Sequence, residues 1–315
     1  MTDTTHRVEY DRTGGPEVLV WRPAPLPPPK AGEVRIAMRA GSVNPIDGKI
    51  RAGRLPPLPL GFPAQTGRDG MGVVTALGPE VDAAWLGRRV AFLAPRGPAG
   101  TWAQAVTMPV AVLAPVPDAV GDLQAAALPL AGLSAAAVLA LGGIAPGQSA
   151  KGGRVLVHAA NGGVGRIAVQ LARLAGAEVH ATASAANRAA LIALGAARVW
   201  AYDSEDLAAR DMDMVVDLLG GEAHAASYAT LRPGGLIACL NAAPFVDRST
   251  ECGVRVAVAE VVPDPAVLAR LLDMVAHGDL DPGPTRILPA SDFAQAQRLS
   301  DSGHLAGKLV LDFRG

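Results

Sequence analysis

Residues 155–165 read Val-Leu-Val-His-Ala-Ala-Asn-Gly-Gly-Val-Gly, an apolar run that ends in a glycine-rich turn. The turn leads into a helical pattern with apolar residues at positions 167, 169, 171, 172 and 174. Glycines let a backbone approach a phosphate closely, and the helix that follows offers unpaired N–H groups and the positive end of its dipole. The sequence therefore predicts a strand, turn and helix that bind the pyrophosphate of a nicotinamide or flavin dinucleotide.

The glycine pattern departs from the usual fingerprint at one position. Against the template G-x-G-x-x-G the aligned residues are Ala160, Gly162 and Gly165, so the first glycine is replaced. The turn follows a β-branched strand, leads into a helix and is followed by a second strand at 177–182. This context distinguishes a nucleotide-binding turn from a strand–helix turn that has only a structural role. We therefore expect the cofactor to lie against Ala160, Asn161, Gly162, Gly163, Val164 and Gly165.

The end of the second strand indicates which dinucleotide binds. An acidic residue there would hydrogen-bond the ribose 2′-hydroxyl of NAD, but residues 182–188 read Thr-Ala-Ser-Ala-Ala-Asn-Arg. Ser184 can donate to a 2′-phosphate, and Arg188 can pair with it as a charged fork. The sequence favours NADPH, bound near Thr182, Ser184 and Arg188; the alternative is that Arg188 is an ordinary solvated helix residue.

Length and composition are typical of an enzyme of about two domains, since the chain has 315 residues. Half of the residues are hydrophobic, yet no stretch of ~18 residues lacks Gly, Pro and charge, so no membrane span is expected. The N-terminus lacks the apolar core of a signal peptide, which predicts a cytoplasmic location.

A net charge of −1 without a basic cluster argues against nucleic acid or a membrane as partner. The two cysteines, Cys239 and Cys252, form no C-x-x-C pair, which argues against a disulfide framework or a structural zinc site.

The pattern of predicted secondary structure changes between residues 120 and 125. Up to about residue 120, short β-type runs at 33–39, 72–77, 89–93 and 110–116 are broken by proline and glycine, as in a β-rich, partly barrel-like domain. From about residue 125, a helical stretch at 124–142 precedes strands at 154–158, 178–182, 198–201, 214–218 and 236–240, with helical stretches between them. This alternation predicts a doubly wound parallel sheet. The tail, with a helix near 292–299 and a strand at 308–312, should pack onto the first domain.

A series of short motifs runs nearly from end to end of the chain. They are GGPEVL at 14–19, GEV at 32–34, SVNPID at 42–47, TGRDGMGVV at 66–74, GTWAQ at 100–104, AALPLAGLSA at 126–135, the turn at 162–165 and GKLV at 307–310. In this order they resemble the medium-chain dehydrogenase/reductase superfamily, in its zinc-free NADPH quinone oxidoreductase (zeta-crystallin-like) branch. The resemblance implies an α/β fold in which a Rossmann sheet (125–260) is inserted in a GroES-like catalytic domain (1–124 and 261–315).

The same resemblance implies chemistry without a metal. Zinc alcohol dehydrogenases of the superfamily carry a Cys ligand where this chain has Asn44, and a His-Glu pair where it has Arg68-Asp69. Arg cannot ligate zinc, and Asn is a poor ligand. We expect hydride transfer from NADPH to a small electrophilic acceptor, a quinone or an activated carbon–carbon double bond. Asp47 and Asp69 should satisfy loop amides and nearby cations, the alternative being a two-carboxylate acid/base pair.

The resemblance also assigns site residues. It places Asn44 on the pocket floor near the nicotinamide, Ser134 beside the ring and Tyr202 near the adenosine, with Leu240, Asn241 and Lys308 as further cofactor contacts. Many relatives carry a Tyr five residues after the Asn, where this chain has Lys49. The Lys49 ammonium either stabilises the developing oxyanion of the acceptor or is a solvated loop residue.

Other functions remain open. A dedicated enoyl reductase of a biosynthetic pathway would carry the same motifs, and a non-catalytic NADPH-binding protein would bind the cofactor without turnover. A short-chain dehydrogenase is excluded, because its glycine turn would lie near the N-terminus and Tyr228 is followed four residues later by Arg232 instead of Lys. The resemblance implies a homodimer formed by edge-to-edge pairing of a strand, for which 253–259 is the candidate.

Overall fold

The computed structural model describes residues 3–55, 61–97, 100–148, 153–240, 245–283, 285–303 and 305–314. The chain divides into two compact units. The first comprises Met1–Leu130, Val262–His277 and Gly283–Gly315, and the second comprises Ala131–Val261 and Gly278–Pro282. Within the described residues no helix has the length and apolar character needed to cross a bilayer.

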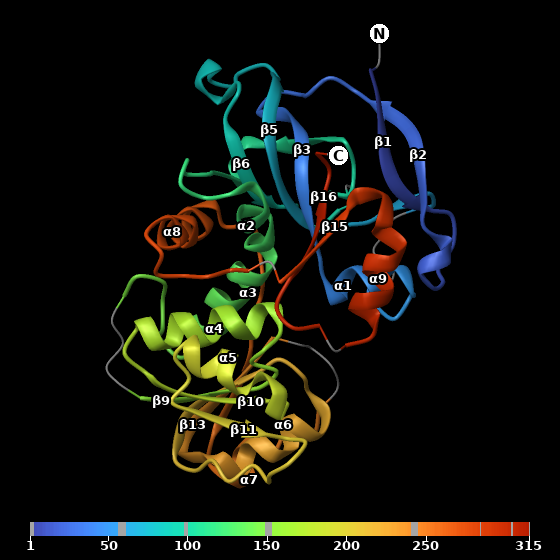
Figure 1. Ribbon diagram of the computed structural model, residues 1–315. Coiled ribbons are helices and arrows are strands. Elements are labelled where there is room, and N and C mark those ends of the chain that lie inside the picture. Colours follow the sequence, from blue (N-terminus) through green and yellow to red (C-terminus); the bar gives the residue numbers. More distant parts are fainter. Residues whose placement is uncertain are drawn as a thin grey trace. The chain divides into compact units, whose positions relative to one another are not determined.

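The first unit is built on two sheets (Figure 1). The larger has the order β15 (Arg286–Pro289), β16 (Leu309–Asp312), β3 (Glu33–Val43), β5 (Asp69–Leu77), β6 (Arg89–Leu93) and β8 (Leu113–Pro115), with β7 (Ala105–Pro109) paired to β3. The smaller has the order β2 (Val20–Leu26), β1 (Asp3–Tyr10) and β4 (Ala64–Gln65). Burial alternates along β3, which places Val34, Ile36 and Met38 in the core. This period of two is the reason why the segment forms a half-buried strand.

Helices complete the first unit. They are α1 (Pro45–Arg51), α2 (Asp122–Ala127), α8 (Pro265–Ala276), α9 (Phe293–Asp301) and the start of α3 (Pro129–Ala140). Helix α8 begins with Asp264 as N-cap, whose side chain accepts the N–H of Val267, and buries Leu268, Leu271 and Leu272. The apolar spacing of three and four residues is the pattern that turns one helical face to a core.

The second unit holds one parallel sheet of six described strands, in the order β11 (Arg198–Ala201), β10 (Glu178–Ala183), β9 (Arg154–Val157), β12 (Met212–Asp217), β13 (Leu231–Cys239) and β14 (Arg255–Val258). Its helices are the part of α3 from Ala131 on, α4 (Gly163–Leu174), α5 (Arg188–Ala193), α6 (Gly221–Ser227) and α7 (Ser249–Cys252). The chain starts in the middle at β9, proceeds to one edge and then continues from β12 to the other. This is the doubly wound Rossmann order, in which ligands bind at the carboxyl ends of the strands where the order reverses.

Some sequence predictions of secondary structure are wrong in detail. Residues 110–116 do not form one strand, because a 3-10 turn at Val110–Val112 precedes β8 and the longer strand is β7. Residues 124–142 form two helices, since Pro129 lacks the N–H that would continue the first. Strand β2, which contains Pro23 and Pro25, was not predicted from the sequence. These prolines are tolerated because β2 is an edge strand.

Candidate functional site

The glycine-rich turn joins β9 to α4, as the sequence predicts (Figure 1). Helix α4 has Gly162 as N-cap, and the N–H of Arg166 donates to Gly162 O at 3.0 Å. The N–H groups of the first turn have no acceptor within the helix, and the dipole is positive at this end. The turn therefore presents the backbone donors that a phosphate requires.

Close packing explains why the turn needs its last glycine. A Cβ on Gly165 would lie 2.4 Å from Ala159 O and 2.7 Å from Ala160 Cα, so α4 rests directly on the turn backbone. A Cβ on Gly162 would meet only Ala159 O, at 3.4 Å. Ala160, which replaces the first glycine, is fully buried and donates its N–H to Thr182 O at 3.1 Å. The described residues fit a dinucleotide pyrophosphate.

Arg166 is a residue that the sequence analysis did not assign to this turn. Its guanidinium donates to Oδ1 of Asn161, which is buried, at 3.2 Å. A cation on the first helical turn adds to the positive end of the dipole, where an anion would bind. The signal in the sequence was the Arg that directly follows Gly165.

Two carboxylates lie beside the loop after β10. Asp203 Oδ1 accepts the N–H of Ala185 at 2.9 Å, and Glu205 forms an ion pair with Arg188. The N–H of Ala201 and the Arg188 guanidinium lower the pKa of Glu205. The segment between β10 and β11 contains no acidic residue, and these two carboxylates follow the adjacent strand β11 instead. The guanidinium proposed for a 2′-phosphate therefore already has an anionic partner.

The remaining predicted cofactor residues of the second unit are distributed as follows. Thr182 Oγ1 lies 3.0 Å from His158 Nδ1, and Ser184 Oγ accepts from Asn187 at 2.7 Å. Ser134 lies on α3 and is buried. Leu240 directly follows β13 and is half-buried, whereas Tyr202 directly follows β11 and is 68% exposed. The ends of β9, β10 and β13 bring the turn, Thr182 and Leu240 to the same edge of the sheet. Asn241 lies outside the described residues.

In the first unit, Asn44 lies in a buried polar network. Its Nδ2 donates to Asp69 Oδ1 at 2.9 Å and to Ser42 Oγ at 3.1 Å. Its Oδ1 accepts from Lys308 Nζ at 2.6 Å, and the same ammonium donates to Val43 O at 3.2 Å. Asn44 is 4% exposed and Lys308 5%, while Ser42 and Asp69 are fully buried. An anion on one side and a cation on the other thus fix the orientation of the Asn44 amide.

Strand register brings this network together. Asn44 follows β3 and precedes α1, and Asp69 opens β5, which is antiparallel to β3. Lys308 directly precedes β16, whose first residue Leu309 pairs with Val43. Burial lowers the pKa of Lys308. The four side chains therefore come from three neighbouring strands, and Lys308 touches Asn44 although the two are far apart in sequence.

Asp47 caps the helix that Asn44 begins. Its Oδ2 accepts the N–H of Asn44 at 2.8 Å, and Asp69 Oδ2 accepts the N–H of Leu130 at 2.8 Å. The prediction that both carboxylates satisfy backbone amides is confirmed. The other carboxyl oxygen of Asp47 is buried without a hydrogen-bond partner among the described residues. Burial raises the pKa of Asp47 to about 7.

Lys49 lies apart from the network. It is exposed on α1, and no ion pair or hydrogen bond joins its ammonium to the described part of the chain. Its exposure agrees with a solvated residue, and its part in catalysis stays a prediction. The buried ammonium beside Asn44 is that of Lys308.

Known proteins resemble this chain over its whole length. Family models match at residues 30–118 (alcohol dehydrogenase GroES-like domain) and 194–311 (zinc-binding dehydrogenase); the zinc of that description assigns no ligand in this chain. The chain is 30% identical to the chloroplast envelope quinone oxidoreductase homolog of Arabidopsis thaliana, over 98% of each. It is 32% identical to a mycocerosic acid synthase-like polyketide synthase of Mycobacterium tuberculosis, over 90% of this chain and 14% of that protein. The structure of the quinone oxidoreductase from Coxiella burnetii matches with a TM-score of 0.89 at 30% identity, covering 99% of this chain and 100% of that one.

The chain therefore belongs to the medium-chain dehydrogenase/reductase superfamily, in its quinone oxidoreductase-like branch. It is a nicotinamide-dependent oxidoreductase of the quinone oxidoreductase type. The parallel Rossmann sheet and the GroES-like unit that the sequence predicts are confirmed.

Proposed function

We propose that this protein reduces a quinone or an activated carbon–carbon double bond, such as that of an enone or alkenal, with NADPH and without a catalytic metal. The observation that carries the proposal is the Asn44 network. By the resemblance, zinc enzymes of the superfamily carry a ligand Cys at the position of Asn44 and a His-Glu pair at the positions of Arg68 and Asp69. Here the Asn44 amide is instead bound between the Asp69 carboxylate and the Lys308 ammonium. The full-length similarity to quinone oxidoreductases supports the same reaction class.

In this proposal the residues of the chain bind and orient, and the nicotinamide supplies the hydride when it is bound. The N–H groups at the start of α4 and the Arg166 guanidinium hold the pyrophosphate. Asn44 contacts the nicotinamide end of the cofactor. Because Asp69 and Lys308 fix its amide, Asn44 needs no reorganisation when the reactants bind.

A dedicated enoyl reductase is the second candidate function. The observation that favours it is the similarity to polyketide synthases, of which the erythronolide synthase EryA2 of Saccharopolyspora erythraea is 34% identical over 95% of this chain and 8% of its own length. Both candidates add hydride to an electron-poor carbon and differ in the acceptor. The acceptor pocket of an enoyl reductase would prefer a thioester.

The test is a screen of cofactor oxidation by the purified protein. NADPH and NADH are each offered with quinones, 2-alkenals, enones and enoyl thioesters. Turnover of quinones, enones or alkenals supports the proposed function, and turnover confined to enoyl thioesters supports the second candidate. Stoichiometric NADPH binding without turnover on any class would contradict both and indicate a binding protein. We expect the protein to act in the cytoplasm, where NADPH is available.

Arg188→Ala is expected to weaken NADPH binding roughly ten-fold or more while NADH binding stays unchanged, because loss of a charge-assisted pair costs about 1.5–3 kcal/mol. Glu205→Gln should strengthen NADPH binding by no more than a few-fold, since an ion pair at the surface is weak. The glutamine can still accept the Ala201 N–H. Cofactor titration followed by fluorescence measures both. Equal affinities of the parent for NADPH and NADH would contradict the preference.

Turnover is expected to survive exhaustive dialysis against a chelator. Asn44 is held by Asp69 and Lys308, and Arg68 donates to Ala94 O at 3.1 Å, so neither supplies a zinc ligand. Rates before and after dialysis, with the metal content measured in parallel, provide the check. A loss of turnover that added zinc restores in Cys239→Ser as well as in the parent would show that the reaction uses a metal.

We also propose that two chains pair through β14, the edge strand of the second unit's sheet. An exposed edge presents unpaired N–H and C=O groups, and Val258 on it is 47% exposed. Light scattering at micromolar concentration should give about twice the chain mass of 32.1 kDa. Val258→Lys should shift the mass toward one chain, because an edge lysine opposes pairing. A parent protein with the mass of one chain would contradict the dimer.

A further inference from the structure

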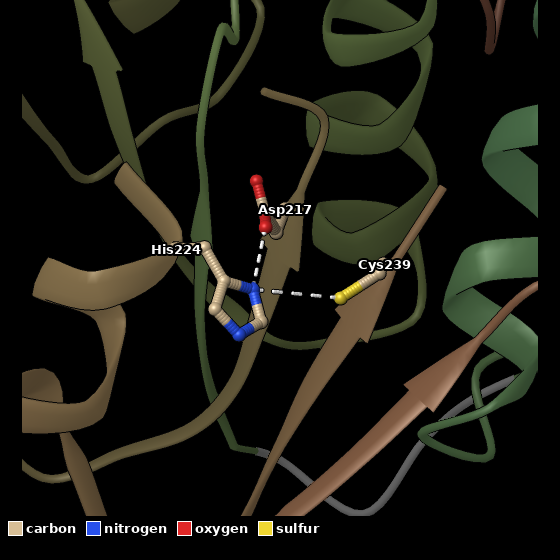
Figure 2. Close-up of side chains that lie close together, drawn as sticks. All are labelled: Asp217, His224 and Cys239. Carbon is tan, nitrogen blue, oxygen red and sulfur yellow. Dashed lines mark hydrogen bonds and ion pairs between the residues drawn. The ribbon is translucent and has the colours of Figure 1, made fainter. Parts of the chain in front are cut away.

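Three buried side chains of different chemistry converge at the carboxyl edge of the second unit's sheet, where β12 lies beside β9, the strand that leads into the glycine turn. Asp217 ends β12, His224 lies on α6 and Cys239 ends β13 (Figure 2). His224 Nδ1 lies 2.9 Å from Asp217 Oδ2 and 3.7 Å from Cys239 Sγ. All three ligand atoms lie within 4.8 Å of one another, and each residue is at most 2% exposed.

A Cys-His-Asp catalytic triad does not explain this cluster. In a triad the nucleophile and the carboxylate bind opposite nitrogens of the imidazole. Here both Asp217 and Cys239 face the same nitrogen, Nδ1 of His224 (Figure 2). Burial and the charge of Asp217 raise the pKa of the Cys239 thiol to about 12, which leaves it without nucleophilic character.

The opposite nitrogen of His224 is fixed by a second set of contacts. Nε2 lies 3.1 Å from the hydroxyl of Tyr228, which accepts the N–H of Arg248 at 3.0 Å and donates to Val246 O at 3.4 Å. With its proton directed to Val246, the hydroxyl can accept a hydrogen from Nε2. In that tautomer Nδ1 carries a lone pair, so Nδ1, Asp217 Oδ2 and Cys239 Sγ together offer three donor atoms to a cation. Without a cation, the thiol hydrogen of Cys239 can donate to Nδ1 instead.

The spacing of these atoms suits a tetrahedral thiophilic ion. Zinc bond lengths of about 2.0–2.3 Å place neighbouring ligand atoms of a tetrahedral site about 3.3–3.6 Å apart. The observed 3.7 Å between sulfur and nitrogen and 2.9 Å between nitrogen and oxygen require shifts of a few tenths of an ångström. The other oxygen of Asp217 is already occupied, because Oδ1 accepts the N–H groups of Leu219 and Gly220. Oδ2 is therefore the oxygen left for a ligand bond.

We propose that Asp217, His224 and Cys239 form a binding site for a divalent metal ion of the zinc type. Binding forms bonds to Oδ2, Nδ1 and Sγ, and the thiol proton is released to solvent. The two anionic ligands then neutralise the charge of the ion, which allows it to be buried. The ion joins β12, α6 and β13, so its part is to stabilise the second unit; none of the three residues belongs to the proposed reaction.

Cobalt(II) is the probe, because a bond from cobalt to a thiolate absorbs in the near ultraviolet. The full chain without a histidine tag is treated with chelator under reducing conditions and titrated with Co²⁺ alone. The parent should take up one equivalent and show both the thiolate band and the visible bands of tetrahedral cobalt. Cys252→Ser is the matched control and should keep all bands, since Cys239 is then the one thiol left among the two cysteines of the chain.

Cys239→Ser and His224→Leu should each lose the thiolate band or the stoichiometric uptake. Added Zn²⁺ should raise the thermal unfolding temperature of the parent and of Cys252→Ser by several degrees, and of neither cluster variant. A parent without a thiolate band, a band that persists in Cys239→Ser, or one that is lost in Cys252→Ser overturns the proposal. If Cys239→Ser does not fold, the cobalt spectrum of Cys252→Ser decides the question alone.

Discussion

Asn44→Ala is expected to lower turnover by a factor on the order of 10² and to weaken NADPH binding as well, since a small misplacement of the nicotinamide has a cost of that size. The alanine removes the amide that joins Asp69 to Lys308. Lys308→Met should lower turnover in the same direction, because the Asn44 carbonyl then loses its donor and can rotate. Steady-state rates and cofactor titrations on the acceptor found by the screen measure both effects.

Lys49→Ala tests whether Lys49 contributes to turnover, as Lys308 is expected to do. Because Lys49 is exposed, we expect its variant to stay within about two-fold of the parent rate. If the Lys49 ammonium instead binds the developing oxyanion, turnover falls by a factor on the order of 10²–10³ while NADPH dissociation is nearly unchanged. A Lys308→Met enzyme with the parent's rate, stability and cofactor affinity would contradict the positioning role of Lys308. Lys308→Arg, which keeps the charge, should recover part of the rate.

The periodicity of the sequence was sufficient for most strands and helices. Alternating burial along β3 and the apolar face of α4 follow directly from residue order. Prolines caused the errors in both directions. Pro129 divides a segment that was predicted as one continuous helix. The prolines of β2 argued against a strand there, although an edge strand tolerates proline.

The contacts that define the candidate site depend on which strands are neighbours, and that information is not local. Asn44 could be singled out from its motif, but its contact with Lys308 requires β16 to pair with β3 in one register. Glu205 reaches Arg188 because β11 lies beside β10, and a search of the residues after β10 alone could not find it. The Cys239 cluster likewise needs β12 next to β13, so the spacing of cysteines gave no sign of it.

The second large effect is the dependence of the free energy of unfolding on pH, to which two buried groups contribute with opposite sign. Burial raises the pKa of Asp47 from 3.8 to about 7, so between these values the folded protein holds a proton that the unfolded chain has lost. The stability contributed by Asp47 is therefore fully present below pH 3.8 and is lost as the pH rises to 7, by about 4 kcal/mol. Burial lowers the pKa of His158 from 6.5 to about 4, so the unfolded chain holds the extra proton there. The stability contributed by His158 consequently rises between pH 4 and 6.5, by about 3 kcal/mol.

Because the two effects nearly cancel, the parent should show a shallow dependence of stability on pH between about pH 4 and 6.5, and single variants should expose each effect. Asp47→Asn keeps an oxygen for the Asn44 N–H, so its free energy of unfolding should rise with pH over this range and exceed the parent's most at neutral pH. His158→Gln can still bond Thr182 and Ser227, and its stability should fall as the pH rises. Thermal and denaturant unfolding at closely spaced pH values measure the slopes. Curves for both variants that run parallel to the parent's would mean that neither side chain carries the proton assigned to it.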